Sequence, residues 1–452
     1  MSKPRNIVLL IADSLRYDSV HVGGDARLPY TTANGSTFTQ ARSGGCWTLP
    51  ATASLFTGLM PHEHGADAQT RGLHTDVPTL AERMKALGYR TIHITANVAT
   101  TEVFGLDRGF DELHRIWQLV PAHYQKIHEL LVLVGKPRLR KQILSTDFVR
   151  GKLSEDIEAG KVWLQSTNED VFALARQKLA EAEKDGQPCF LFLNLMETHF
   201  PYHIDDTFGF MEDGIVGKLQ EVVALYHLVN QTWLTTGEQP IDPQMMARLK
   251  ERQRRAWTRL APKVDAFVQE MHGHKDTTVV FGADHGDNFG EQGWAYHFSN
   301  VTDAGNRVPL FWLRAHESDG KTIDTPVSSR DVFQGLLKEA GDTKAGFHIA
   351  EEPEASFPIM QSCWYNNQNR TLPRFRYNQI CYFEGGTRWL NRSGEWYSAP
   401  PAPEVGEEAP FVRIPGRVQP LEELNIPPER RDYLKKVNTD FERFSQKIME
   451  KA

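Results

Sequence analysis

Short apolar segments alternate along the chain with longer stretches of helical periodicity. Each apolar segment is bounded by polar or turn residues, and the four clearest cover residues 7–11, 91–95, 190–195 and 277–281. The stretches with the spacing of an amphipathic helix include residues 77–87 and 171–184. Continuous apolar runs that alternate with helices are typical of parallel strands buried on both faces. The pattern therefore predicts an α/β fold with a mostly parallel central sheet flanked by helices.

The pattern changes after about residue 318. Residues 379–397 alternate between apolar and polar positions around two turns, which predicts a small antiparallel sheet. Residues 400–410 are rich in proline and glutamate, as expected of a linker or surface loop. We therefore expect a main domain, a small C-terminal α+β subdomain, and a linker with a C-terminal helix, at residues 1–318, 319–400 and 401–452.

One segment of the main domain stands apart from the alternating pattern. Residues from about 205 to 271 are helix-rich and basic in places. Two interpretations remain open for them: an insertion that caps a site, or a solvated helical hairpin.

Composition narrows the class of protein. Hydrophobic residues make up 40% and charged residues 24% of the 452 residues, as in an ordinary globular protein. A net charge of −7 offers no bulk attraction to nucleic acid. The four cysteines form no C-x-x-C pair, which argues against a zinc ribbon or a disulfide framework. No stretch approaches eighteen uncharged apolar residues, so we expect no membrane insertion and a cytoplasmic location.

Ionisable and polar residues gather where the predicted strands end. Asp13 follows the first strand, Asn97 the second, His199 the third, and the pair Asp284-His285 the fourth. In open α/β sheets ligands bind beyond the carboxyl ends of the strands. A carboxylate and an imidazole side by side there can face one divalent cation, and Asp13 can add a second carboxylate if its strand is a neighbour.

A second candidate feature is a run of small hydroxylated residues ahead of a predicted helix, from Thr48 to Gly58. The unsatisfied N–H groups of a helix start suit an anion or a nucleophile held there. The alternative is that Thr48 or Thr52 simply caps the helix. His297 lies twelve residues beyond His285, and a single histidine is more often structural or solvated than functional.

Taken together in their order, these features resemble the sulfatase branch of the alkaline-phosphatase superfamily over roughly residues 5–315. The similarity includes the first strand with its Asp13, the Thr48-Leu49-Pro50 segment and the Asp284-His285-Gly286 motif. The six blocks that carry the resemblance are residues 7–16, 48–65, 104–111, 199–202, 284–293 and 306–310.

The resemblance implies roles for individual residues. A divalent cation (Zn, Mn, Mg or Ca) is expected on Asp13, Asp284 and His285, with the Thr48 hydroxyl completing its shell and acting as the nucleophile. His199 and His297 are expected to contact the substrate or protonate the leaving group, and Asn97 to bind a nonbridging oxygen. The number of ions stays open, since a second one has the candidate ligands Asp287, His203, His199 and His297.

The chain also departs from the sulfatase pattern. Thr48 stands where sulfatases have the cysteine that becomes formylglycine, so no formylglycine is expected. Ala51 and Thr52 replace the serine and arginine that follow, Ser14 replaces a second acidic ligand, and His297 appears in place of a lysine. A threonine nucleophile with this histidine spacing is similar to the phosphoethanolamine and phosphoglycerol transferases, which carry transmembrane helices.

These observations predict a metal-dependent hydrolase of phosphate monoesters, phosphodiesters or phosphonate esters that works through a covalent Thr48 intermediate. The expected partner is a small-molecule ester, with no nucleic acid. A sulfate ester hydrolase and a soluble phosphotransferase are the alternatives, because the leaving group and the acceptor have no readable motif. A non-catalytic relative that binds an anion is a third. Oligomeric state is open.

Overall fold

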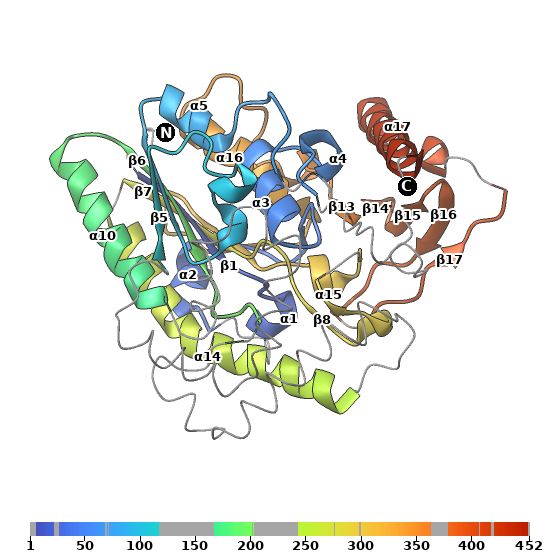
Figure 1. Ribbon diagram of the computed structural model, residues 1–452, viewed down its shortest axis with the longest axis horizontal. Coiled ribbons are helices and arrows are strands. Elements are labelled where there is room, and N and C mark those ends of the chain that lie inside the picture. The colour runs from blue at the N-terminus through green and yellow to red at the C-terminus, as the bar shows by residue number, and fades with distance from the viewer. Residues whose placement is uncertain are drawn as a thin grey trace, which may run out of the picture.

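A computed structural model describes most of the chain, and Figure 1 shows a central sheet with helices on both faces and a second, smaller sheet beside it. The described residues are 6–21, 27–67, 70, 72–116, 167–200, 202, 243–274, 276–297, 300–362, 378–405, 407–416 and 420–450. The large sheet has eight strands in the order β11-β2-β10-β7-β1-β6-β4-β5. The predicted fold class is confirmed.

The four predicted strands lie side by side at the centre of this sheet. They are β1 (Asn6–Ala12), β4 (Arg90–Thr95), β6 (Cys189–Leu195) and β7 (Thr277–Gly282). β1 pairs in parallel with β6 on one side and β7 on the other, and β4 pairs in parallel with β6. Because neighbouring parallel strands end at one edge, the residues that follow β1, β6 and β7 are brought together there.

The outer strands complete the sheet. β5 (Glu112–Arg115) pairs in parallel with β4 at one edge, and β11 (Lys321–Ile323) pairs in parallel with β2 (Ser36–Phe38) at the other. Between them, β10 (Leu310–Leu313) runs antiparallel to both β2 and β7.

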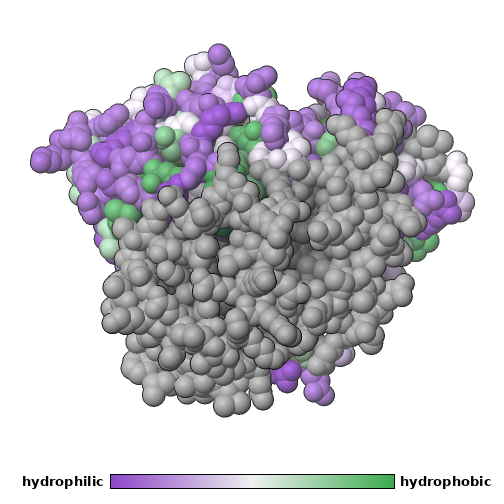
Figure 2. Space-filling model, in the orientation of Figure 1, coloured by the Kyte–Doolittle hydropathy of each residue, from purple (hydrophilic) through white to green (hydrophobic). Residues whose placement is uncertain are grey.

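Helices cover the two faces of the sheet (Figure 1). On one face lie α10 (Asn168–Lys184) and the long α14 (Pro243–Gly273). Phe172 of α10 stacks on Phe267 of α14, with the ring centroids 4.2 Å apart. On the other lie α3 (Thr48–Thr57), α5 (Leu80–Ala86) and α16 (Val332–Glu339). α14 falls largely in the segment predicted to be helix-rich, but residues 205–242 of that segment lie outside the described residues. Over α10, α5 and α17, the outer surface in Figure 2 is mainly hydrophilic.

The predicted C-terminal antiparallel sheet is present. It comprises β13 (Ile359–Ser362), β14 (Gln379–Glu384), β15 (Thr387–Arg392), β16 (Glu395–Ala399) and β17 (Val412–Arg413). The C-terminal helix α17 (Pro428–Glu450) packs on it through buried Leu434, Val437 and Phe441. β11 belongs to the large sheet and α16 packs beside it, so the described small sheet begins at β13. The predicted domain boundary at residue 318 stays a prediction.

The segment expected to be a linker carries one buried side chain that connects the small sheet with the chain between β7 and β10. Glu408 pairs with Arg388 of β15 at 3.3 Å and accepts hydrogen bonds from the Gln292 side chain and the Ala304 backbone N–H. A carboxylate in such a position has little access to water, so residues around 408 are part of the packed structure and not a simple tether.

Several short elements connect the longer ones. They are α1 (Tyr17–Val20), α2 (Pro29–Asn34), β3 (Ala41–Arg42) with β12 (Val327–Ser328), α4 (Pro61–His64), the hairpin β8 (Asn288–Phe289) with β9 (Ala295–Tyr296), and α15 (Asp303–Asn306).

Candidate active site

Asp13, Asp284 and His285 meet at the ends of β1 and β7, as the sequence predicts. One side-chain ligand atom from each lies within 4.8 Å of the other two, and all three residues are fully buried. His285 Nε2 is 3.6 Å from Asp13 Oδ1 and 3.5 Å from Asp284 Oδ2. The arrangement follows directly from the topology, because β1 and β7 are adjacent and parallel.

The chemistry of these three groups fits a cation. His285 Nδ1 faces the Gly286 carbonyl at 3.0 Å, and since a carbonyl only accepts, Nδ1 carries the proton. In the neutral ring, Nε2 therefore presents a lone pair to two carboxylates. Asp284 Oδ2 has no hydrogen-bond partner among the described residues, although it is buried. Three electron-pair donors without a shared proton are the ligand set of a divalent cation.

The charges of these groups also shift one another's pKa values. Burial, together with the nearby Asp13 carboxylate, raises the pKa of Asp284 to about 7. Burial also opposes a charged His285, but the carboxylates of Asp284 and Asp13 outweigh it and raise the pKa of the imidazole. Without a cation, protons partly take over the neutralisation of these carboxylates.

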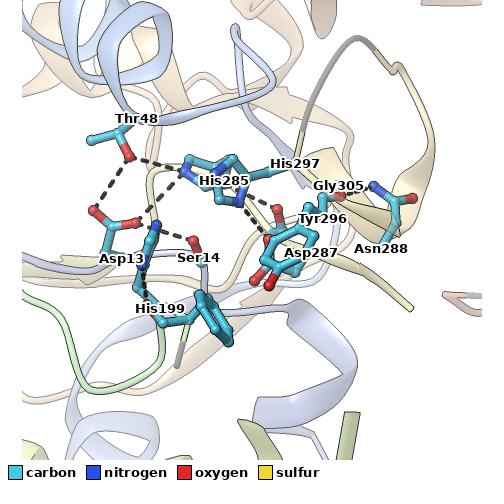
Figure 3. Close-up of polar contacts among 12 residues, drawn as sticks. Asp13, Ser14, Thr48, His199, His285, Asp287, Asn288, Tyr296, His297 and Gly305 are labelled. Atoms are coloured by element: carbon cyan, nitrogen blue, oxygen red, sulfur yellow. Dashed lines mark hydrogen bonds and ion pairs between the residues drawn. The ribbon is translucent and has the colours of Figure 1, made fainter. Parts of the chain in front are cut away.

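Thr48 points its hydroxyl into this cluster (Figure 3). Its Oγ1 lies 3.3 Å from His285 Nε2 and 3.5 Å from Asp13 Oδ2, and the residue is only 3% exposed. The residue that caps α3 is Trp47, which makes no side-chain capping bond, so the interpretation of Thr48 as an N-cap is wrong. As the first residue of α3, Thr48 lies beside backbone N–H groups that have no partner within the helix.

Asn97 contacts the candidate metal ligand Asp13. Its Nδ2 donates to Asp13 Oδ2 at 2.7 Å, and its Oδ1 accepts the Ala99 N–H. Asn194, at the end of β6, adds a longer contact of 3.4 Å to the same carboxylate oxygen. The contact made in the described structure orients Asp13, and the binding of a substrate oxygen by Asn97 stays a prediction.

His297 is held by the carboxylate of Asp287, which lies on the same segment as Asp284 and His285. Its Nδ1 lies 2.5 Å from Asp287 Oδ1, and Tyr202 donates its hydroxyl to Asp287 Oδ2 at 2.8 Å. Burial lowers the pKa of His297 to about 4, even though Asp287 favours its charged form. The ring is therefore neutral near pH 7, with Nδ1–H donated to Asp287.

The three imidazoles form one group (Figure 3). The ring centroid of His297 lies 4.6 Å from that of His285 and 5.3 Å from that of His199. The His199 Nδ1 donates to the Phe200 carbonyl at 2.8 Å. Each of the three rings thus has its Nδ1 in a hydrogen bond within the protein.

Ligand atoms of His285, Asp287 and His297 also lie within 4.8 Å of one another. Asp287 already accepts hydrogen bonds from His297 and Tyr202. In this second group it therefore offers no unsatisfied carboxylate oxygen comparable with Asp284 Oδ2. His203, another candidate ligand, lies outside the described residues.

Sequence reasoning missed the supporting contacts around the ligands. Tyr202 lies in the block 199–202 and Asp287 directly follows Asp284-His285-Gly286, so the motifs indicate both positions. No such signal marks Thr198, which donates its hydroxyl to the Asp13 carbonyl, or Gln253, which reaches the site from α14.

The sulfatase family model matches residues 5–341 of the chain. Arylsulfatase A of Bos taurus is 26% identical over 265 residues, which is 51% of this chain and 51% of the bovine protein. Arylsulfatase K of Xenopus laevis is 21% identical over 369 residues, 74% of this chain and 63% of the frog protein. The chain thus spans about half to two thirds of the length of these curated relatives.

Among solved structures, the phosphonate monoester hydrolase of Agrobacterium radiobacter has a similar fold. The TM-score is 0.58 at 15% identity, and the match covers 98% of this chain and 96% of the hydrolase. At this identity the match shows the fold alone. Among the described helices, none has the length and apolar character needed to cross a membrane, and the cytoplasmic location stays a prediction.

Proposed function

The chain belongs to the sulfatase family, and from that premise we propose that it hydrolyses small phosphoric or phosphonic esters with the Thr48 hydroxyl as its nucleophile. The observation that carries the proposal is the position of Thr48 Oγ1, buried and directed at His285 Nε2 and Asp13. A side chain that serves neither a helix cap nor the apolar core is well placed for chemistry.

Asp13, Asp284 and His285 are the residues that would hold the cation. Bound there, a divalent cation supplies Lewis-acid chemistry, which lowers the pKa of a coordinated hydroxyl and offsets charge on the transferred group. The carboxylate of Asp13, 3.5 Å from Thr48 Oγ1, accepts the hydrogen bond of that hydroxyl and orients it.

The reaction is two successive displacements at phosphorus. Thr48 Oγ attacks and its proton passes to the Asp13 carboxylate that accepts its hydrogen bond, so that a bond from Thr48 to phosphorus forms while the bond to the leaving alcohol breaks. Water then attacks the phosphothreonine, the bond to Thr48 breaks, and the hydroxyl regains a proton. N–H groups at the start of α3 stabilise charge on the oxygens of the transferred group.

His199 and His297 are the candidates for moving the protons. Both are buried imidazoles that use Nδ1 within the protein, which directs proton exchange to Nε2. A neutral His297 can take the proton from the attacking water, and His199 can give a proton to the leaving oxygen when it is protonated. Asp287 and Tyr202 fix the orientation of His297 but make no contact that would place them on the substrate.

A phosphoryl substrate is favoured over a sulfuryl one because of the chemistry of threonine. The formylglycine hydrate of sulfatases has a second hydroxyl on the same carbon and expels sulfate by collapse of that centre. Thr48 has a single oxygen on its β-carbon, so the group can leave only by attack at phosphorus or sulfur. Kinship with the arylsulfatases keeps sulfate ester hydrolysis as the second candidate.

Matched p-nitrophenyl substrates test the proposal. The metal-reconstituted protein is given the phosphate monoester, phosphodiester, phosphonate monoester and sulfate, and initial rates are compared with those of Thr48→Ala. The matched control is Thr57→Ala at the other end of α3, whose hydroxyl donates to the Ala53 carbonyl and accepts the Leu59 N–H.

Faster cleavage of a phosphorus ester, lost in Thr48→Ala and kept in Thr57→Ala, is the expected result. Preferred cleavage of the sulfate would overturn the substrate class. Equal rates for Thr48→Ala and the unaltered protein would overturn the nucleophile. Absence of turnover with Zn²⁺, Mn²⁺, Mg²⁺ and Ca²⁺ alike would overturn the hydrolase assignment.

A further inference from the structure

A single buried side chain from α14 bridges the two loops that carry the site. Gln253 is fully buried, and its Nε2 donates to the Ser14 carbonyl at 2.8 Å and to the Thr198 carbonyl at 3.1 Å. Its Oε1 accepts the Ser19 hydroxyl at 2.9 Å. Two carbonyls require two donors, so the orientation of the amide is fixed by its partners.

Both acceptors lead directly to the cation ligands. Ser14 donates its N–H to Asp284 Oδ1 at 3.2 Å and its hydroxyl to Asp13 Oδ1 at 3.1 Å. Thr198 donates its hydroxyl to the Asp13 carbonyl at 2.8 Å. Gln253 is therefore one residue away from both carboxylates, by way of the loop after β1 and the loop after β6.

The backbone at Ser14 needs such support. Its φ is +60°, in the left-handed region, which is uncommon for a residue with a Cβ. Conformations of this kind are energetically unfavourable and persist where surrounding contacts hold them. At Ser14 the N–H, the hydroxyl and the carbonyl each have a partner, and Gln253 supplies the partner for the carbonyl.

We propose that Gln253 is a positioning residue of the cation site, because its amide holds the Ser14 and Thr198 carbonyls at a distance that directs Asp13 and Asp284 toward one point. The proposal rests on the proposed function, since it presupposes a cation on Asp13, Asp284 and His285. It also gives α14 a defined role: the helix braces the ligand loops in addition to covering the sheet.

The test measures cation affinity and ligand geometry rather than turnover. The full chain, stripped with a chelator, is titrated with Zn²⁺ by calorimetry, and its Co²⁺ complex is examined by visible absorption. Gln253→Met keeps the length of the side chain and removes both donors. Loss of contacts that orient metal ligands typically weakens affinity about 10- to 100-fold. We expect a loss of that size and an altered Co²⁺ spectrum.

Matched variants separate positioning from stability. Glu251→Gln changes an exposed residue of the same helix and is expected to bind as the unaltered protein does. Ser19→Ala frees only the outer end of the amide and is expected to shift affinity less, in the same direction, which keeps the test valid if Gln253→Met folds poorly. Thermal unfolding of each variant is recorded, since a merely structural role would lower stability without changing the Co²⁺ spectrum.

The outcomes distinguish this proposal from the one it rests on. Unchanged Zn²⁺ affinity and Co²⁺ spectra in Gln253→Met and Ser19→Ala, with binding lost in Asp284→Asn, would overturn the role of Gln253 and leave the cation site standing. No Zn²⁺ or Co²⁺ binding by the unaltered protein would overturn the cation site itself, and the role of Gln253 with it.

Discussion

His297 Nδ1 and Asp287 Oδ1 lie 2.5 Å apart, and this pair sets the orientation of an imidazole at the candidate site. Tyr202 in turn holds the other oxygen of Asp287, so the carboxylate has little freedom to turn. Because Nδ1–H is committed to Asp287, the neutral ring keeps its lone pair on Nε2. The same carboxylate also fixes the tautomer of the ring, because a hydrogen-bond acceptor beside Nδ1 requires the proton to be on that nitrogen.

We predict that Asp287 acts through His297. Asp287→Ala should lower kcat about 10- to 100-fold, the usual size of an effect on an orienting partner. His297→Ala should lower it at least as much, and the double variant should be no slower than His297→Ala alone. Steady-state kinetics on the preferred p-nitrophenyl ester measure all three. Losses that simply add would mean that the two residues act independently.

A second prediction concerns the fate of Thr48. Thr48→Val has nearly the same shape but no hydroxyl, so it should form no covalent adduct and lose turnover, whereas Thr48→Ser should keep part of it. Rapid quenching with a phosphorus ester, followed by peptide mass spectrometry, should find phosphothreonine at position 48 in the unaltered protein. Adduct on another residue, or full turnover by Thr48→Val, would contradict the mechanism.

The sequence was sufficient to predict the centre of the fold and the meeting of Asp13, Asp284 and His285, because both depend on short-range patterns. β1, β4, β6 and β7 are short apolar runs, and Asp13 and the pair Asp284-His285 come directly after two of them. Once strands are parallel neighbours, the residues at their ends must converge. No knowledge of side-chain contacts was needed for that step.

The contacts that orient the ligands could not be predicted in this way. Gln253 lies 239 positions from Ser14 in the sequence, on a helix whose path over the sheet is set by tertiary packing. Glu408 was taken for part of a linker because proline and glutamate dominate its segment, yet it is buried against Arg388. The position of each of these polar side chains depends on tertiary contacts, and no local sequence pattern indicates such contacts.

A third prediction is that His93 limits stability in acid. His93 is fully buried among Phe56, Phe110 and Phe192, and burial, with a smaller effect of His114, lowers its pKa from the ordinary 6.5 to about 3. Between these values the unfolded chain binds a proton that the folded chain excludes. Stability contributed by the neutral ring is therefore present above pH 6.5 and falls as the pH drops, by up to about 1.4 kcal/mol per pH unit.

His93→Phe should make the pH dependence of unfolding shallower between about pH 6 and pH 3. Phenylalanine keeps the ring contacts, and Thr100, whose hydroxyl contacts the His93 imidazole, retains its bonds to Thr95 and the Asn97 carbonyl. Urea titrations at several pH values measure the slope, with the exposed His74→Gln as control. An unchanged slope in His93→Phe would show that His93 is protonated in the folded state.

The last prediction follows from the orphaned oxygen of Asp284. In Asp284→Asn the remaining Oδ1 can still accept the N–H groups of Ser14 and His285, which bond to that atom now. The new amide N–H groups replace Oδ2 and face the His285 lone pair and Asp13, where an uncompensated buried carboxylate stood before. In the presence of a chelator the variant should therefore be at least as stable as the unaltered protein, because it loses a buried like charge.

Cation binding should reverse that order. A ligand at about 100 times its Kd stabilises the folded state by about 2.7 kcal/mol, so Zn²⁺ should raise the melting temperature of the unaltered protein and leave that of Asp284→Asn almost unchanged. Differential scanning calorimetry with and without chelator measures both comparisons. If Asp284→Asn were much less stable than the unaltered protein in chelator, the carboxylate would be holding the loops together by itself. Two buried carboxylates repel each other unless protons or a cation neutralise them, so a bound cation should stabilise the folded state.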